Sequence, residues 1–241
     1  MALLILGGLF LLIWPSFDTH ILQAVDRIKA SDKLKQIGLA IHNYEAAQGE
    51  LPTNTYAPDG TPLLSWRVHI VPYLDDTNLY REFKLDEPWN SPHNTRLLQR
   101  IPDAYRHPRQ TSESGNKTCF RGFSNPGAVF ERRPPRNLAL PLLGGPVADM
   151  KTRFSFANLK DPLSETFLVV EAEELVEWTK PDDLDASPDK PFPKLGAPRR
   201  RGESFGSVRC DGSVRWLPIA TDETMLRALV SHSSGEKVPD E

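Results

Sequence analysis

Hydrophobic residues are unevenly distributed along this chain, and the first 17 positions hold its longest apolar run. Residues 1–17, MALLILGGLFLLIWPSF, contain no charged side chain, and the first one is Asp18. As a helix, this run spans about 25 Å, at the short end of what crosses a hydrocarbon core of about 30 Å. We therefore predict that residues 1–17 form a membrane anchor inserted in a lipid bilayer. A cleaved signal peptide and a buried core helix are the alternatives.

The apolar residues that follow keep a helical spacing. They form two stripes: Ile21, Val25 and Ile28, then Leu34, Ile37, Ile41 and Tyr44. The phase shifts near Asp32, so either a kink or a change of the buried face is expected there. Gly49 and Pro52 are typical of a helix end. The pattern predicts an amphipathic stem over 18–48 that continues the anchor, with one stripe packed on a sheet.

The body, residues 49–235, alternates short apolar runs with turn residues. Its pattern predicts strands at 63–71, 104–107, 118–123 and 166–171, and short helices after Asp75 or Asp76, after Ser91-Pro92, and from Thr221-Asp222-Glu223. Prolines throughout 179–202 predict a connection with little regular structure. Residues 236–241 are expected to form a tail.

A hairpin is predicted around Asp211-Gly212. A two-residue turn would put Val208 and Val214 on opposite faces of the sheet. A three-residue loop over 210–212, with Gly212 left-handed, instead gives two same-face pairs, which are Val208 with Val214 and Gly206 with Trp216. We expect this second register because it buries a coherent apolar set. The fold class predicted is therefore α+β: a pilin-like long N-terminal helix packed on an antiparallel β-sheet, with short extra helices and a C-terminal hairpin plus helix.

Composition excludes several classes of protein. The 22 prolines among 241 residues argue against long bundles and solenoids, since proline ends helices. The formal net charge of −3 argues against a nucleic-acid partner, which usually requires a basic face. Only two cysteines are present, which excludes a disulfide-dense scaffold and an all-cysteine zinc site.

Several long motifs occur in a characteristic order. They are SDKLKQIGLAIHNYEAAQGELP, LLSWRVHIVPYLDDTNLYREFKLDEPWNSPHN, ETFLVVEAEELVEWTKPDDL, PFPKLGAP and CDGSVRWLP. Over residues 31–235 the chain resembles domain-of-unknown-function family 1559 (DUF1559), a large bacterial family of pseudopilin-like proteins. The resemblance implies a pilin-like N-terminal helix, a β-rich extracytoplasmic body and no established biochemical activity.

Charges beside the apolar run bear on its orientation. Arg27, Lys29, Lys33 and Lys35 follow it closely, and the positive-inside rule then favours a cytoplasmic body. The resemblance implies the opposite side, so the two signals conflict. Following the resemblance, we expect a single-pass protein of the inner (cytoplasmic) membrane whose body is extracytoplasmic.

Few residue patterns suggest chemistry. The six histidines lack the spacing typical of metal ligands, so we expect no metal, no cofactor and no catalytic residue. The acidic residues Glu171, Glu173, Glu174 and Glu177 precede Trp178. Paired carboxylates beside a tryptophan could hydrolyse a glycoside, whereas charges on an exposed strand edge are the commoner arrangement. Cys119 and Cys210 are either a disulfide or free thiols.

Tryptophans are the remaining candidates for a site. Trp66 and Trp216 are expected in the core, whereas Trp89 and Trp178 are candidate recognition residues. The leading hypothesis is a non-enzymatic, membrane-anchored, pseudopilin-like protein that acts through protein contacts in an envelope or secretion assembly. The alternative is an anchored extracytoplasmic module that binds a glycan or peptide, and an enzyme comes third.

Overall fold

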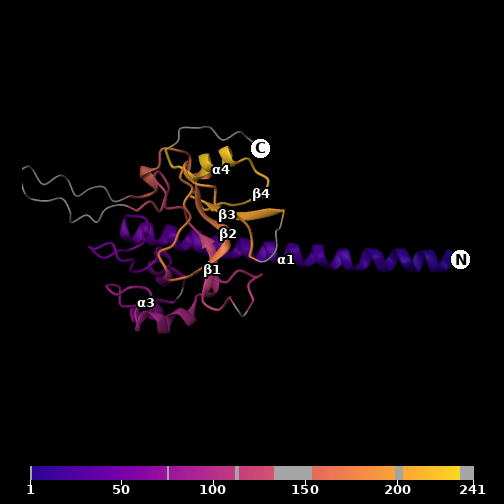
Figure 1. The fold of residues 1–241 in the computed structure, drawn as a ribbon, viewed down its shortest axis with the longest axis horizontal. Coiled ribbons are helices and arrows are strands. Elements are labelled where there is room, and N and C mark those ends of the chain that lie inside the picture. Colours follow the sequence, from indigo (N-terminus) through magenta and orange to yellow (C-terminus); the bar gives the residue numbers. More distant parts are fainter. Residues whose placement is uncertain (1, 75, 112–113, 133–153, 199–202, 234–241) are drawn as a thin grey trace, which may run out of the picture.

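A computed structural model describes residues 2–74, 76–111, 114–132, 154–198 and 203–233, with only the backbone described for residues 2–20. The chain begins with one continuous helix, α1 (Ala2–Gln48), whose N-terminal half projects away from the body (Figure 1). Gly49 ends α1 with a left-handed φ of 70°, and its N–H donates to the Glu45 carbonyl at 2.7 Å. The predicted end of the stem helix is confirmed.

Four antiparallel strands form the sheet. They are β1 (Lys117–Arg121), β2 (Phe167–Glu177), β3 (Ser204–Arg209) and β4 (Val214–Pro218), and they lie side by side in sequence order. The β3–β4 hairpin pairs Val208 with Val214 and Gly206 with Trp216, and Gly212 has a φ of 82°. The three-residue loop predicted from the sequence is therefore confirmed, and so is the α+β fold class.

The C-terminal half of α1 packs closely on this sheet. Leu34, Ile37 and Ile41 are fully buried beneath it. Two glycines allow the close approach: a Cβ on Gly38 would lie 2.8 Å from Val208 Cγ2, and one on Gly206 would lie 2.8 Å from Leu34 Cδ1. Larger side chains at these two positions would push the helix away from β3.

Short helices surround the sheet. They are α2 (Trp66–His69), η1 (Val71–Leu74), α3 (Thr77–Glu82), η2 (Asn94–Arg100), η3 (Asp103–Tyr105), η6 (Phe156–Asn158), η7 (Leu163–Glu165) and α4 (Glu223–Val230). Asp76 caps α3 by accepting from the Leu79 N–H, and Asp222 caps α4 by accepting from the Thr224 N–H. The helices predicted after Asp75 or Asp76 and from Thr221-Asp222-Glu223 are confirmed, and the structure selects Asp76 as the cap of the first.

The sheet separates two apolar cores. One lies between the sheet and α1 and includes Leu34, Ile37 and Trp178. The other lies between the sheet and α4 and includes Phe205 and Leu226. The sheet therefore forms a central layer that α1 covers on one face and α4 on the other (Figure 1).

Three predicted elements differ in the structure. Residues 63–71 contain α2 and the start of η1 rather than a strand, because Ser65 caps a helical turn that sends Trp66, Arg67 and Val68 into the interior together. Residues 104–107 are not a strand either, since η3 occupies their start. The helix after Ser91-Pro92 is a 3-10 helix that begins only at Asn94, whose N–H donates to Ser91 Oγ. Local alternation cannot reveal that three successive side chains will all be buried.

The remaining predictions of regular structure hold. Strands β1 and β2 occupy the segments expected at 118–123 and 166–171, and β2 continues to Glu177. Between 179 and 198, the described connection contains only isolated bridges, at Leu184 and Leu195. Residues 199–202 of that connection, like most of the predicted tail at 236–241, lie outside the described residues.

Candidate functional site

The helix α1 carries a row of exposed apolar side chains where it leaves the body. Ile21, Leu22, Val25 and Ile28 have exposed fractions of 48%, 63%, 39% and 62%. The first burial on the described part of the helix begins at Ala30. The expected change of the buried face near Asp32 is thus what the structure shows, and α1 runs through that point as one helix. The upstream stripe remains uncovered within the described chain.

The exposed face continues beside the body. Successive helical residues are about 100° apart, so Ile21, Ile28 and Leu39 lie within about 20° of one another around the axis. Leu39 is 62% exposed, and Ile37, about 180° from Ile28, is fully buried. We call Ile21, Val25, Ile28 and Leu39 the outer stripe of α1. It points away from the sheet, with the exposed charges of Asp32 and Lys35 between its apolar residues.

Several contacts hold α1 to the body close to this stripe. Trp216 on β4 donates its indole N–H to Ser31 Oγ at 2.9 Å, and Arg27 lies over the same ring at 4.7 Å. Arg109 Nε lies 3.2 Å from Asp26 Oδ2, and Lys33 forms an ion pair with Asp103. These contacts fix the direction in which the helix leaves the body, and they leave the outer stripe uncovered.

The predicted anchor, residues 1–17, lies where no side chains are described. Across the described side chains, no helix combines the length and the apolar character needed to span a bilayer. The membrane anchor and its lipid partner remain predictions.

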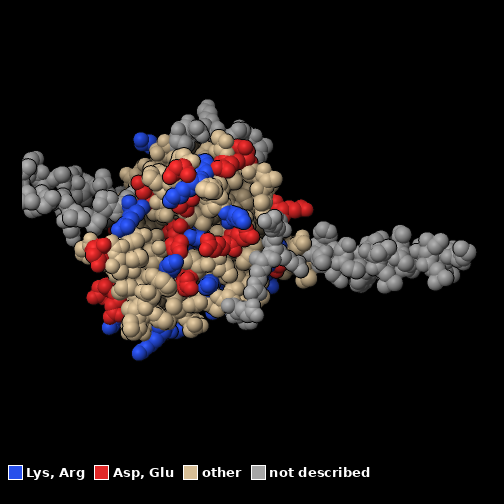
Figure 2. All heavy atoms as spheres, in the orientation of Figure 1, with Lys and Arg blue, Asp and Glu red and all other residues tan. Residues whose placement is uncertain are grey.

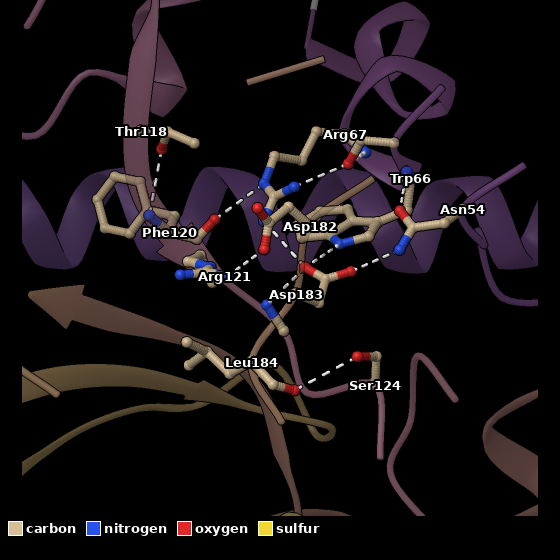
Figure 3. A network of polar contacts seen from close by, with 12 residues as sticks. Asn54, Trp66, Arg67, Thr118, Phe120, Arg121, Ser124, Asp182, Asp183 and Leu184 are labelled. Atoms are coloured by element: carbon tan, nitrogen blue, oxygen red, sulfur yellow. Dashed lines mark hydrogen bonds and ion pairs between the residues drawn. The ribbon is translucent and has the colours of Figure 1, made fainter. Parts of the chain in front are cut away.

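A buried ion pair between Arg67 and Asp183 lies at the centre of a polar network (Figure 3). The Asp183 side chain is completely buried and accepts four hydrogen bonds. Their donors are Arg67 Nη2 at 2.9 Å, the Trp66 indole N–H at 3.1 Å, the Asn54 amide at 2.7 Å and the Gly122 N–H at 3.2 Å. The pair therefore joins α2 and the end of β1 to the proline-rich connection.

Each of the three guanidinium nitrogens of Arg67 donates a hydrogen bond. Its Nε donates to the Phe120 carbonyl at 2.9 Å and its Nη1 to Ser65 Oγ at 2.8 Å. Burial lowers the pKa of Arg67, and the Asp183 carboxylate opposes that shift. Neither charge reaches solvent, so both groups interact only with the surrounding protein. Sequence reasoning missed this network, although a lone arginine inside the apolar run LLSWRVHIV was a usable signal.

A second buried pair joins His107 and Glu171, which lie 64 positions apart in the sequence. The Arg109 N–H donates to His107 Nδ1, so the ring proton lies on Nε2, which donates to Glu171 Oε1 at 3.0 Å. Glu171 Oε2 also accepts from the Gly206 N–H at 2.9 Å. The two side chains are only 2% and 0% exposed, so no substrate can reach them. Glu171 is not on an exposed edge, and that expectation is wrong for this residue.

The two tryptophans predicted for recognition occupy different environments. Trp178 is fully buried, lies near Phe83 and Tyr105, and donates its indole N–H to the Leu98 carbonyl at 3.0 Å. It therefore presents no surface to a ligand, which corrects the prediction. Trp89 is only partly buried in its loop, and the Lys180 ammonium lies 5.9 Å from its ring centre.

The two cysteines are also buried. Cys119 and Cys210 are buried free thiols, and burial raises the pKa of both.

Among the described residues, no three histidine, cysteine or acidic side chains are grouped so that they could hold a metal ion. Acidic and basic residues are intermixed on the face shown in Figure 2, and this face has no field of one sign.

Comparison with known proteins identifies the family. Residues 23–196 match the model of a family described as proteins of unknown function, DUF1559. The chain belongs to this family, as its motifs predicted. No curated protein and no solved structure matches the chain.

Proposed function

We propose that this protein is a non-enzymatic, membrane-anchored, pseudopilin-like component of an envelope or secretion assembly, in which it acts through protein contacts. One observation carries the proposal: the outer stripe of α1 exposes apolar side chains on a helix that the body holds in a fixed direction. Exposed apolar side chains gathered on one face of a helix are typical of an interaction site.

Burial energy favours covering the outer stripe, and the spacing of its residues favours a helix as the partner. Fully burying one Leu, Ile or Val side chain is worth about 1.5–3 kcal/mol, so covering the outer stripe would contribute several kcal/mol. The apolar positions Ile21, Val25 and Ile28 follow a spacing of four and three residues, which is the spacing that lets one helix pack along another. The charges of Asp32 and Lys35 would set the register of that contact.

The contact can be mapped by crosslinking in native membranes. A photo-crosslinking residue at Val25 should yield adducts with a partner protein, and the double variant Val25→Asp, Ile28→Asp should lose assembly. Gln23 is the matched control, since it is exposed on the same turn but lies about 140° from Ile28 around the axis. Equal crosslinking from positions 23 and 25 would contradict a docking face.

The anchor and the orientation need separate tests. Membranes containing the full chain should release it with detergent and retain it in alkaline carbonate. Release by carbonate alone would contradict a membrane anchor.

A reporter that is active only in the periplasm, fused at the C-terminus, should be active if the body is extracytoplasmic. An inactive periplasmic reporter together with an active cytoplasmic one would reverse the orientation.

A further inference from the structure

A pocket of about 270 Å³ opens on the side of the sheet that faces α4. Phe205 on β3 and Leu226 on α4 are buried at its floor, whereas Ile219, just after β4, is 40% exposed at its rim. The volume exceeds the roughly 150 Å³ of an apolar cavity that holds benzene. A molecule built on one aromatic ring therefore fits the pocket.

Two charged residues border the pocket, Glu173 on β2 and Lys194 in the segment beside it. Their neighbours Ala172 and Leu195 pair in an antiparallel bridge, and both of these side chains belong to the core on the α4 face. Successive side chains along a strand point to opposite faces, so Glu173 and Lys194 point away from α4. They border the pocket through their backbone, and the side chains that face its interior are apolar.

The protein's own contacts hold the wall of the pocket, residues 192–197, in place. The Gly196 N–H donates to the Glu171 carbonyl on β2 at 3.0 Å. Gly196 has a φ of 136°, and a Cβ there would lie 3.3 Å from Ile219 Cδ1. The guanidinium of Arg227 lies 5.4 Å from the Phe192 ring centre. A wall that is already ordered lowers the entropic cost of binding a ligand.

Four phenylalanine rings form a connected row behind the pocket. The ring centres of Phe192 and Phe123 are 6.1 Å apart, those of Phe123 and Phe167 are 6.0 Å apart, and those of Phe167 and Phe205 are 6.3 Å apart. Aromatic rings attract one another at separations of about 4.5–7 Å. The two ends of the row, Phe192 and Phe205, both line the pocket. An aromatic ring placed in the pocket can therefore contact both ends of the row.

We infer that this pocket binds a small, uncharged aromatic molecule whose ring lies between Phe192 and Phe205. An aliphatic molecule of the same size gains the same apolar contact but lacks the attraction between rings. A charged molecule loses its hydration without meeting an opposite charge inside the pocket. The inference is independent of the proposed assembly role, because α1 and its outer stripe lie on the other side of the sheet.

Ligand-detected NMR titration of the full chain in lipid nanodiscs tests the ligand class, with empty nanodiscs to subtract partitioning into lipid. Phenol should bind about fivefold more tightly than cyclohexanol, which has the same size and no aromatic ring. Benzoate and benzylamine, which are charged at neutral pH, should bind at least about tenfold more weakly than phenol.

Three results of this titration would overturn the inference. They are no binding of phenol, equal affinities for phenol and cyclohexanol, and equal affinities for phenol and the two charged compounds. Tighter binding of N-acetylphenylalanine amide than of phenol would assign the pocket to an aromatic side chain of a partner protein, and would also overturn a free molecule as the ligand.

Variants test the position of the ligand. Ile219→Asp places a charge at the rim and should weaken phenol binding about threefold or more. Leu85→Asp is the matched control, because Leu85 is also 40% exposed but does not line the pocket. Equal effects of these two aspartate variants would refute the site.

Phe192→Leu tests the contact between rings. It keeps the wall apolar but removes one end of the row, so the preference for phenol over cyclohexanol should decrease from about fivefold to about twofold. Both affinities are measured on the same variant, so a change in its stability does not alter their ratio. An unchanged preference would refute the role of Phe192.

Discussion

Arg67 and Asp183 show how much order one buried residue pair imposes. Their partners come from four stretches of the chain: residue 54, the turn at 65–67, the end of β1, and the proline-rich connection (Figure 3). Fixing them in one arrangement positions a segment that has no strand or helix of its own. The proline-rich connection is therefore ordered by side chains rather than by regular backbone pairing.

Removing one member of this pair should be costly. Arg67→Met leaves the Asp183 carboxylate buried without its cation, and we expect a loss of about 3–5 kcal/mol in the free energy of unfolding. The double variant Arg67→Met, Asp183→Leu should lose less than the sum of the two single variants. Urea denaturation of all three measures the coupling, and strictly additive losses would contradict it.

His69 should make stability depend on pH. Its Nε2 atom is buried without a hydrogen-bond partner in the described chain, and burial lowers the pKa of the ring to about 4. The unfolded chain takes up a proton below about pH 6.5, whereas the folded chain does so only near pH 4. Stability should therefore increase with pH between these values, by at most about 1.4 kcal/mol per pH unit.

The variant His69→Leu isolates this contribution. Urea unfolding at pH 5 and pH 7 should show a smaller pH dependence in the variant than in the parent protein. An identical difference between the two pH values in both proteins would exclude His69 as the cause.

At the scale of elements, α1 has two faces with opposite roles. Ile37 and Ile41 are fully buried against the sheet, whereas Leu39 between them is 62% exposed. The same helix turn thus supplies both a core residue and a residue of the outer stripe. Gly38 and Gly206 allow this because they let α1 approach β3 closely.

Aspartate substitutions should separate the two faces. Ile37→Asp or Ile41→Asp buries an unpaired charge and should destabilise the body by at least about 4 kcal/mol, enough to prevent folding. Leu39→Asp, the matched control on the same turn, should change stability by less than about 0.5 kcal/mol. Thermal unfolding measures both effects, and similar melting temperatures for Ile37→Asp and Leu39→Asp would show that α1 does not pack as described.

For the whole molecule, the body encloses only part of its longest element. The C-terminal half of α1 lies in the core, and the N-terminal half extends beyond the body (Figure 1). The projecting segment can meet a bilayer or a partner while the body stays folded, since the contacts of Asp26, Arg27 and Ser31 mark where support ends.

Hydrogen exchange should report this division. Without a partner, amides of residues 21–29 should exchange well before those of 34–44, because only the second segment is covered by the sheet. Mass spectrometry of the full chain measures both segments. Equal protection of the two segments in an isolated monomer would indicate that the projecting half is also covered.

Much of this architecture could be predicted from local patterns. The stem helix, its end at Gly49, the starts of α3 and α4, and the hairpin register follow from spacing, capping and turn chemistry, which depend on neighbours in sequence. The family also follows from ordered motifs. The sequence by itself determined these features, because each depends on residues that are close together in the chain.

Tertiary structure decided the rest. Only folding brings Arg67 within reach of Asp183, 116 positions away, and His107 within reach of Glu171, 64 positions away. It also placed the short helix α2 within 63–71, where a strand was expected, and placed Trp178 in the core. Burial and long-range pairing depend on which segments meet in space. For this reason the sequence predicted two apolar stripes on α1 but not which of them would be buried. The sheet covers the stripe of Leu34, Ile37 and Ile41 and leaves the upstream stripe exposed.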